Sequence, residues 1–208
     1  MFDPKKRGSP ISFPDFASRF KPKFHKPFTH TQNQIQEIIL FEGKRVTFDD
    51  ELLVDCTRPN IVVDGDLVID GNLIMFVDEG FGGFVIVTGN LKADAICLQG
   101  FPELLVGGDV TCKNGIVGIR GDDGGFFDVG GKVKAPVIVA DSYFNFKFEG
   151  DVKGVTINTS SRSWKAQFTQ KNVAEAVLPK FLDGEEGIDS EKVFAAIEKG
   201  KSILRSGK

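Results

Sequence analysis

Few side chains in this sequence are of the kinds that carry out acid–base, nucleophilic or metal chemistry. The two histidines, His25 and His30, lie five residues apart near the N-terminus, with no carboxylate close to them in the sequence. The three cysteines, Cys56, Cys97 and Cys112, lack the spacing of a metal-binding motif, and two of them fall among apolar residues of a repeat. The rest of the chain has no histidine to act as a general base near neutral pH. The sequence therefore predicts a protein that is not an enzyme and that uses no catalytic residue, metal or cofactor.

Aspartates are the other candidates, because two carboxyl groups at a suitable distance can hydrolyse a glycosidic bond. The aspartates concerned are Asp64, Asp66, Asp70, Asp109 and Asp151. Each stands directly before or after a glycine of a repeat, where aspartate is typical of a turn, so a structural role is favoured over a glycosidase pair. The run Gly-Asp-Asp-Gly-Gly from Gly121 to Gly125 resembles a calcium loop, but a calcium-binding β-roll needs tandem nine-residue repeats, which this sequence lacks.

One short phrase recurs through the middle of the chain: an apolar residue, any residue, glycine, usually Asp or Asn, and then Leu or Val. Its glycines are Gly65, Gly71, Gly89, Gly108, Gly131 and Gly150. After the first pair, these glycines are 18, 19, 23 and 19 residues apart, which is the length of one coil of a parallel β-solenoid. The apolar residues on either side of each glycine have the same parity, so in a strand they point to one inward face. The glycine and its polar neighbour favour a corner between two faces of the coil.

A second apolar position follows the later glycines at a nearly constant distance. It is occupied by Ile96, Ile116, Ile138 and Ile157. Two stretches rich in glycine interrupt the repeat, residues 76–84 and 119–127, and both are predicted to be loops. Before the repeat, residues 35–54 alternate like strands around a predicted turn at Glu42 to Lys44, which favours a first hairpin or an irregular coil that closes one end of the solenoid.

After the repeat the pattern becomes helical. Asn172, followed three residues later by glutamate, indicates the start of a helix, and apolar residues follow at helical intervals up to Phe181. Asp189 is placed to cap a second helix from Ser190 to Lys199. Helices this short are marginally stable alone. We therefore expect them to pack on the solenoid and to cap the open end of its last coil.

The predicted fold is mainly β: a right-handed parallel β-helix with a Phe/Pro-rich basic N-terminal arm and a short C-terminal helical cap. The predicted boundaries are residues 1–33 for the arm, 34–160 for the solenoid and 161–208 for the helical segment.

The arm combines many prolines and phenylalanines with a basic cluster, and its prolines predict an extended or disordered segment. Cationic residues beside exposed aromatic ones favour an anionic membrane surface. The candidates for contact with a membrane or a partner are Phe2, Lys5, Lys6, Arg7, Phe13, Phe16 and Phe20. The alternative is that the phenylalanines dock along the solenoid itself.

Charge is distributed unevenly along the chain. Residues 1–30 contain seven Lys or Arg and two Asp, a surplus of five; because the whole chain has a formal net charge of −3, the remainder carries −8. An acidic body without a clustered positive face argues against nucleic acid as a ligand. No apolar run is long enough for a signal sequence or a membrane span. We therefore expect a cytoplasmic protein, with the basic arm as a means of peripheral contact with the inner face of the membrane.

The phrase Gly-Asp-Leu-Val-Ile-Asp-Gly-Asn-Leu at Gly65 to Leu73 resembles the β-helical core of the bactofilins, the polymer-forming cytoskeletal proteins of bacteria. The resemblance covers residues 61–157, and Met1-Phe2 followed by Lys5-Lys6-Arg7 is similar to the membrane-targeting tail in part of that family. The resemblance implies a self-assembling element with a membrane-associating N-terminus. A helical segment after the core departs from the bactofilin pattern, and a capped end would oppose end-to-end assembly.

Three functions remain open on these grounds. A non-catalytic β-solenoid that binds or organises other proteins is favoured. The first alternative is a bactofilin-like self-assembling cytoskeletal element. The second is an immunity or accessory protein associated with a toxin, because bacterial solenoid proteins with such a helical tail resemble this chain. In each case the partner is a protein or a second copy of the chain.

Overall fold

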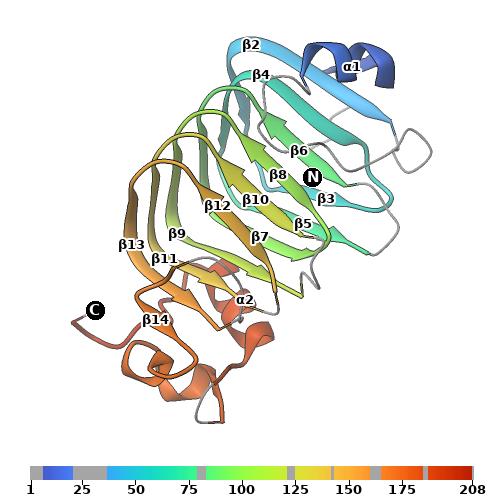
Figure 1. The fold of residues 1–208 in the computed structure, drawn as a ribbon. Helices are drawn as coiled ribbons and strands as arrows, with labels where there is room; N and C mark the ends of the chain where they lie inside the picture. The colour runs from blue at the N-terminus through green and yellow to red at the C-terminus, as the bar shows by residue number, and fades with distance from the viewer. Residues whose placement is uncertain are drawn as a thin grey trace.

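The computed structural model describes residues 7–20, 37–78, 83–120, 125–141, 143–159, 165–184 and 187–207. The chain forms a parallel β-solenoid of about five turns with a helix near its C-terminus, so the predicted mainly β, parallel solenoid is confirmed. Figure 1 shows the coils stacked in chain order, from β2 at one end to β12 and β13 at the other. The solenoid has three faces, each a sheet of parallel strands.

The first face begins with the first halves of two long bent strands. It contains part of β2 (Ile38–Phe48) and β4 (Asn60–Ile69), followed by β6 (Phe84–Val87), β8 (Glu103–Val106), β10 (Phe126–Val129) and β12 (Asn145–Phe148). These strands pair in the order β2-β4-β6-β8-β10-β12. We call it the arm-covered face, because N-terminal residues pack on its outer side.

The other two faces share four long strands that bend at a second corner. These are β7 (Leu91–Gly100), β9 (Val110–Ile119), β11 (Val133–Ala140) and β13 (Val152–Asn158). Their first halves, with the second halves of β2 and β4, form what we call the open face. Their second halves, with β3 (Leu52–Asp55), β5 (Leu73–Val77) and β14 (Phe168–Thr169), form the tail-covered face.

Strand β7 shows how the sequence produces two faces from one strand. Leu91 and Ala93 point into the solenoid core, as alternation requires. The register with β9 then shifts at the corner after Ala93. Before the corner the odd-numbered residues point inward, and after it the even-numbered residues do, so Ile96 and Leu98 continue the same core. Cys97 points outward and joins a second hydrophobic cluster with the C-terminal segment. A bulge at the corner thus lets one strand supply two separate cores.

Glycines form a continuous column at the corner between the arm-covered and open faces. The column is Gly43, Gly65, Gly89, Gly108, Gly131 and Gly150. From Gly89 onward, each glycine N–H donates to the carbonyl oxygen of the glycine one coil before it, at 2.9, 2.9, 3.1 and 3.2 Å. Gly71 is not in this column; it lies at a different corner, where its carbonyl accepts a hydrogen bond from Asp94 N–H at 2.7 Å.

Two expectations about the repeat are corrected. Ile38–Phe48 is one bent strand paired in parallel with β4, so it is the first coil and not a hairpin; Gly43 is a corner residue beneath Gly65. Ile157 does not share the inward position of Ile138, because Thr156 pairs with Ile138 and Ile157 pairs with Val139. Ile157 therefore faces the C-terminal segment.

The described part of the N-terminal arm, residues 7–20, folds against the solenoid, as the alternative expectation for its phenylalanines had it, and contains a strand and a helix in place of an extended chain. Strand β1 (Ser9–Ile11) pairs antiparallel with the start of β2, and helix α1 (Phe13–Arg19) follows it. Ser12 caps α1 by accepting a hydrogen bond from Asp15 N–H at 3.2 Å. Pro14 stands in the first helical turn, where a missing N–H breaks no helix bond. Many prolines in a segment predict an extended chain, but Pro14 lies at the one part of a helix that favours proline, its first turn.

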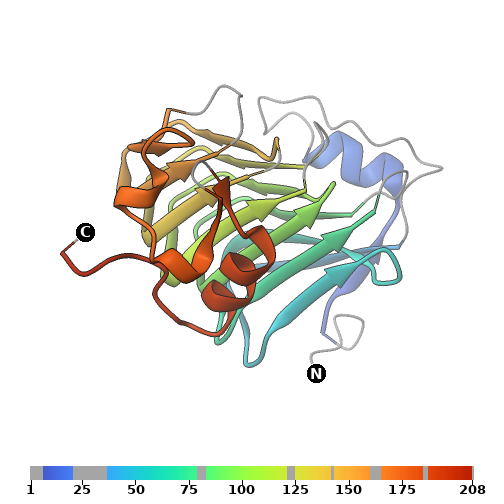
Figure 2. The same cartoon turned by 90° about the horizontal axis from the view of Figure 1, so that it is seen from below.

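Most of the C-terminal segment lies along the side of the solenoid, while β14 pairs with β13 at the edge of the last coil. It contains the 3-10 turns η4 (Val173–Glu175) and η5 (Pro179–Phe181), the strands β15 (Leu182–Asp183) and β16 (Gly187–Ile188), and the helix α2 (Ser190–Glu198). The helix predicted from Asn172 is replaced by two short turns, while the second helix is confirmed, with Asp189 as its cap. Helix α2 packs across β7 and β9 (Figure 2). The predicted cap on the last coil is thus a cover on the tail-covered face.

Candidate functional site

The structure buries two of the phenylalanines predicted to contact a membrane or a partner. Phe16 and Phe20 are fully buried, and the ring of Phe16 stacks on that of Phe84 with 5.2 Å between centroids. Phe13 is half-buried and packs against the same cluster. These side chains dock the described part of the arm on the solenoid, which is the alternative that the sequence left open, and in this arrangement Phe16 and Phe20 are not exposed to a membrane or a partner.

Among the basic candidates, Arg7 lies in the described part of the chain. It pairs with Asp49 at an N–O distance of 3.5 Å, and both side chains are more than half exposed, so the pair contributes little to stability. Phe2, Lys5 and Lys6 lie outside the described residues, and contact through them stays a prediction.

The three cysteines do not form a reactive site among the residues that the structure describes. Cys97 and Cys112 are buried, and burial raises the pKa of both thiols, which disfavours the reactive thiolate. Cys56 is half-buried, and all three cysteines are free. In the ranges that the structure describes, no group of three or more His, Cys, Asp or Glu side chains could hold a metal ion. Both histidines and residues 121–124 lie outside those ranges.

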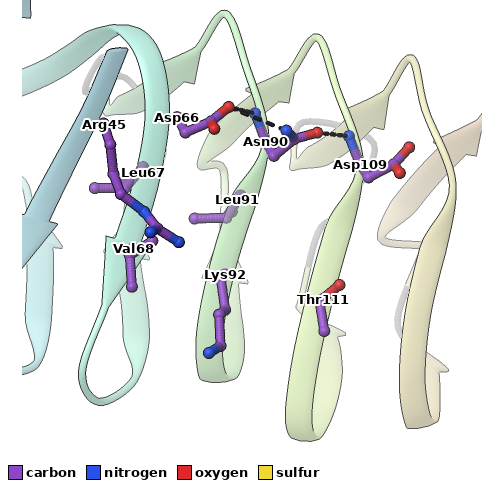
Figure 3. Close-up of a pocket in the computed structure, with 9 residues that line it drawn as sticks. All are labelled: Arg45, Asp66, Leu67, Val68, Asn90, Leu91, Lys92, Asp109 and Thr111. Carbon is purple, nitrogen blue, oxygen red and sulfur yellow. Dashed lines mark hydrogen bonds between the residues drawn. The ribbon is translucent and has the colours of Figure 1, made fainter. Parts of the chain in front are cut away.

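The open face is the candidate site, because its outer side carries polar side chains over which no described segment packs. A shallow groove of about 310 Å³ runs across its first coils (Figure 3). The groove is lined by Arg45, Asp66, Leu67, Val68, Asn90, Leu91, Lys92, Asp109 and Thr111. The other two faces are covered by hydrophobic clusters formed with the arm and with the C-terminal segment.

One edge of this groove is a ladder of side-chain oxygens that join successive coils. Asp66 Oδ1 accepts hydrogen bonds from the N–H of Asn90 at 2.8 Å and from its Nδ2 at 3.1 Å. Asn90 Oδ1 accepts from Asp109 N–H at 2.7 Å, and Asp109 Oδ1 accepts from Lys132 N–H at 2.8 Å. Figure 3 shows this line of bonds along the bends of the coils. The ladder satisfies backbone N–H groups at a corner, where regular strand pairing is interrupted.

A column of outward side chains runs parallel to the ladder. Its members, in register from coil to coil, are Thr47, Val68, Lys92, Thr111, Lys134 and Lys153. The three lysines are exposed, and none pairs with a carboxylate among the residues that the structure describes. Adjacent coils lie about 4.8 Å apart, so the column places three ammonium groups along the open face, with uncharged Thr111 between Lys92 and Lys134.

Sequence reasoning missed this column, although a signal was present. The pattern Leu or Val followed by Lys occurs at Leu91-Lys92, Val133-Lys134 and Val152-Lys153. The position after each inward apolar residue must point outward. Reading those positions as a set, and not one repeat at a time, would have found the lysines. The face has no nucleophile held by a base, so its chemistry is hydrogen bonding and charge.

Within the described residues, no helix has the length and apolar character needed to cross a membrane. No protein-family model matches the sequence, and no curated protein or solved structure shows a significant match.

Proposed function

We propose that the protein is a non-catalytic scaffold that binds another protein through its open face. One observation carries this proposal: described segments near both ends of the chain cover two faces of the solenoid, whereas the third carries three exposed lysines in one column and no described segment packs over it. The surface fits a partner with carboxylates placed opposite that column. Charges on an exposed face govern which partners associate and how fast they do so.

The open face suits binding better than catalysis. Asp66 and Asp109 each use one carboxylate oxygen, Oδ1, to accept a hydrogen bond from the backbone of the next coil, so these side chains hold the stack together. The groove is shallow, whereas a catalytic site needs a cleft that excludes water around its reacting groups. Free cysteines, two of them buried, support a reducing compartment such as the cytoplasm.

Self-assembly through the coil ends is the second candidate. Strand β12 pairs with β10 alone among the described strands, which leaves one of its edges available to a further strand. At the opposite end, β1 already pairs with β2 and runs antiparallel to it. Head-to-tail stacking would have to displace β1, so the arrangement favours the scaffold over an open polymer.

Affinity capture from cells that produce the protein tests the scaffold. The bait is the full chain, the variant Lys92→Glu/Lys134→Glu, or the control Lys165→Glu/Lys171→Glu, which makes the same charge change at two exposed lysines outside the column. We expect partners recovered by the wild type and the control to fall by roughly tenfold with the open-face variant. Equal recovery with all three baits rejects the open face as the binding surface.

Light scattering over a range of protein concentrations tests self-assembly separately. The scaffold account predicts a constant particle mass for the intact chain. Growth of that mass with concentration, unchanged in the open-face variant, favours assembly through the ends.

A further inference from the structure

The C-terminal segment contains a hollow that is separate from the open face. It lies between η5, helix α2 and the residues that follow α2, and its volume is about 540 Å³. Its lining residues are Lys180, Phe181, Lys192, Ala195, Ala196, Lys199 and Lys201. The size falls in the range of sites that hold a small ligand or a few residues of a peptide.

The floor of the hollow is apolar and fixed. Phe181 and Ala196 are buried and belong to the cluster that joins the C-terminal segment to the tail-covered face. The chain after α2 is held by backbone bonds: Lys201 N–H donates to Ala196 O at 2.8 Å, and Leu178 N–H donates to Ile203 O at 2.9 Å. The hollow is thus preformed, and a ligand would not have to order it.

The rim of the hollow carries four lysines, and no acidic side chain among the described residues lines it. Lys192 pairs with Asp189 at 2.7 Å, and Lys180 Nζ lies 4.9 Å from the ring centre of Phe181. Lys199 and Lys201 are exposed, and neither forms an ion pair within the described residues. Two ammonium groups therefore stand beside apolar surface, with no counter-charge from the described part of the chain.

We propose that this hollow binds a short acidic segment of a partner protein, with an apolar side chain seated on the floor and carboxylates facing the lysines. A bilayer fits less well, because membrane binding inserts protruding apolar groups, and the surface here is concave. In the described part of the chain, the large apolar side chains that are exposed are Phe76 and Tyr143, and neither lines the hollow. The site does not depend on the open face.

A fluorescent peptide of alternating glutamate and leucine is the probe, and fluorescence anisotropy with the full chain is the readout. We expect the affinity of the peptide to fall with added salt, because the ion pairs between its carboxylates and the lysines of the hollow are exposed to solvent. Replacing glutamate by lysine in the peptide, or leucine by serine, should lower the affinity by roughly tenfold or more.

The protein variant Lys199→Glu/Lys201→Glu should weaken binding by roughly tenfold, whereas Lys165→Glu/Lys171→Glu should bind as the wild type does. Lys92→Glu/Lys134→Glu should also bind as the wild type, so failure of the hollow and failure of the open face are told apart. No binding of the peptide, or equal binding by the Lys199/Lys201 variant, overturns the proposal. Co-sedimentation with phosphatidylserine vesicles that is lost in that variant would assign the hollow to a membrane instead.

Discussion

At the scale of single residues, the corner between the arm-covered and open faces tolerates the least change. A Cβ atom built on Gly108 would lie 2.8 Å from both the carbonyl carbon and oxygen of Gly89 and 2.5 Å from Asn90 Oδ1. Two of these contacts are with backbone that is itself fixed by pairing to the next coil. Glycine recurs here because neighbouring coils approach too closely for a side chain, whereas the polar residue beside it supplies an acceptor.

Gly108→Ala should lower the free energy of unfolding by about 1–3 kcal/mol, because the added methyl group must push two coils apart. Urea denaturation followed by circular dichroism measures the change. Thr111→Ala, on the exposed side of the same coil, is the control and should change stability by less than about 0.5 kcal/mol. Equal stability of Gly108→Ala and the wild type would show that the corner relaxes freely.

Asp66→Ala should lower stability by about 1 kcal/mol, because it leaves the N–H of Asn90 without its acceptor. Asp66→Asn keeps an oxygen at the same place and should be nearly neutral. If both variants lose the same stability in urea denaturation, the negative charge and not the hydrogen bond is the important property of Asp66.

At the scale of elements, the solenoid depends on segments that are not part of its repeat. Helix α1 places two fully buried phenylalanines on the arm-covered face, and Arg19 at its end pairs with Glu42 at 2.7 Å and Asp64 at 3.6 Å. The C-terminal segment covers the tail-covered face in the same manner, through a second cluster of buried apolar side chains. Each cover buries apolar residues that a free sheet would expose to water.

Phe16→Ala should lower the free energy of unfolding by about 3–5 kcal/mol, because a fully buried ring is removed from contact with Phe84. Phe13→Ala is the matched control, since Phe13 is half-buried and its loss should cost less. Thermal unfolding of the two variants compares the two losses of stability. A larger loss with Phe13 would mean that the arm is docked differently.

The sequence predicted the coils well, because glycine at the corner and apolar residues on the inward side recur with the length of one coil. It predicted the covers poorly. Whether Phe16 packs on the protein or on a partner depends on outward apolar residues such as Ile86 and Leu105, which lie far away in sequence. The lysine column depends likewise on the register between coils. The sequence spacing of the lysines gives that register only once the corner residues of each coil are known.

At the scale of the whole molecule, the described chain is asymmetric: segments near its two ends cover two faces of the solenoid, and no described segment covers the third. Figure 1 shows α1 and α2 on different sides of the stack. A partner that binds along the coils can therefore reach the open face without displacing either cover. The same asymmetry separates this protein from a plain rod, whose sides would be equivalent.

Thiol labelling of cysteines introduced one at a time on the three faces tests this asymmetry most directly. In a Cys56→Ser background, which keeps the buried Cys97 and Cys112, the variants Thr111→Cys, Ile86→Cys and Val139→Cys each add one thiol on the open, arm-covered and tail-covered faces, where the native side chains are exposed, 1% exposed and 0% exposed. Mass spectrometry of the labelled chain follows the introduced thiol separately from Cys97 and Cys112. We predict that the folded Thr111→Cys protein reacts with a maleimide at nearly the rate of the urea-unfolded chain. The other two should react only when unfolded. Rapid labelling of Ile86→Cys or Val139→Cys in the folded protein, or protection of Thr111→Cys, would contradict the account.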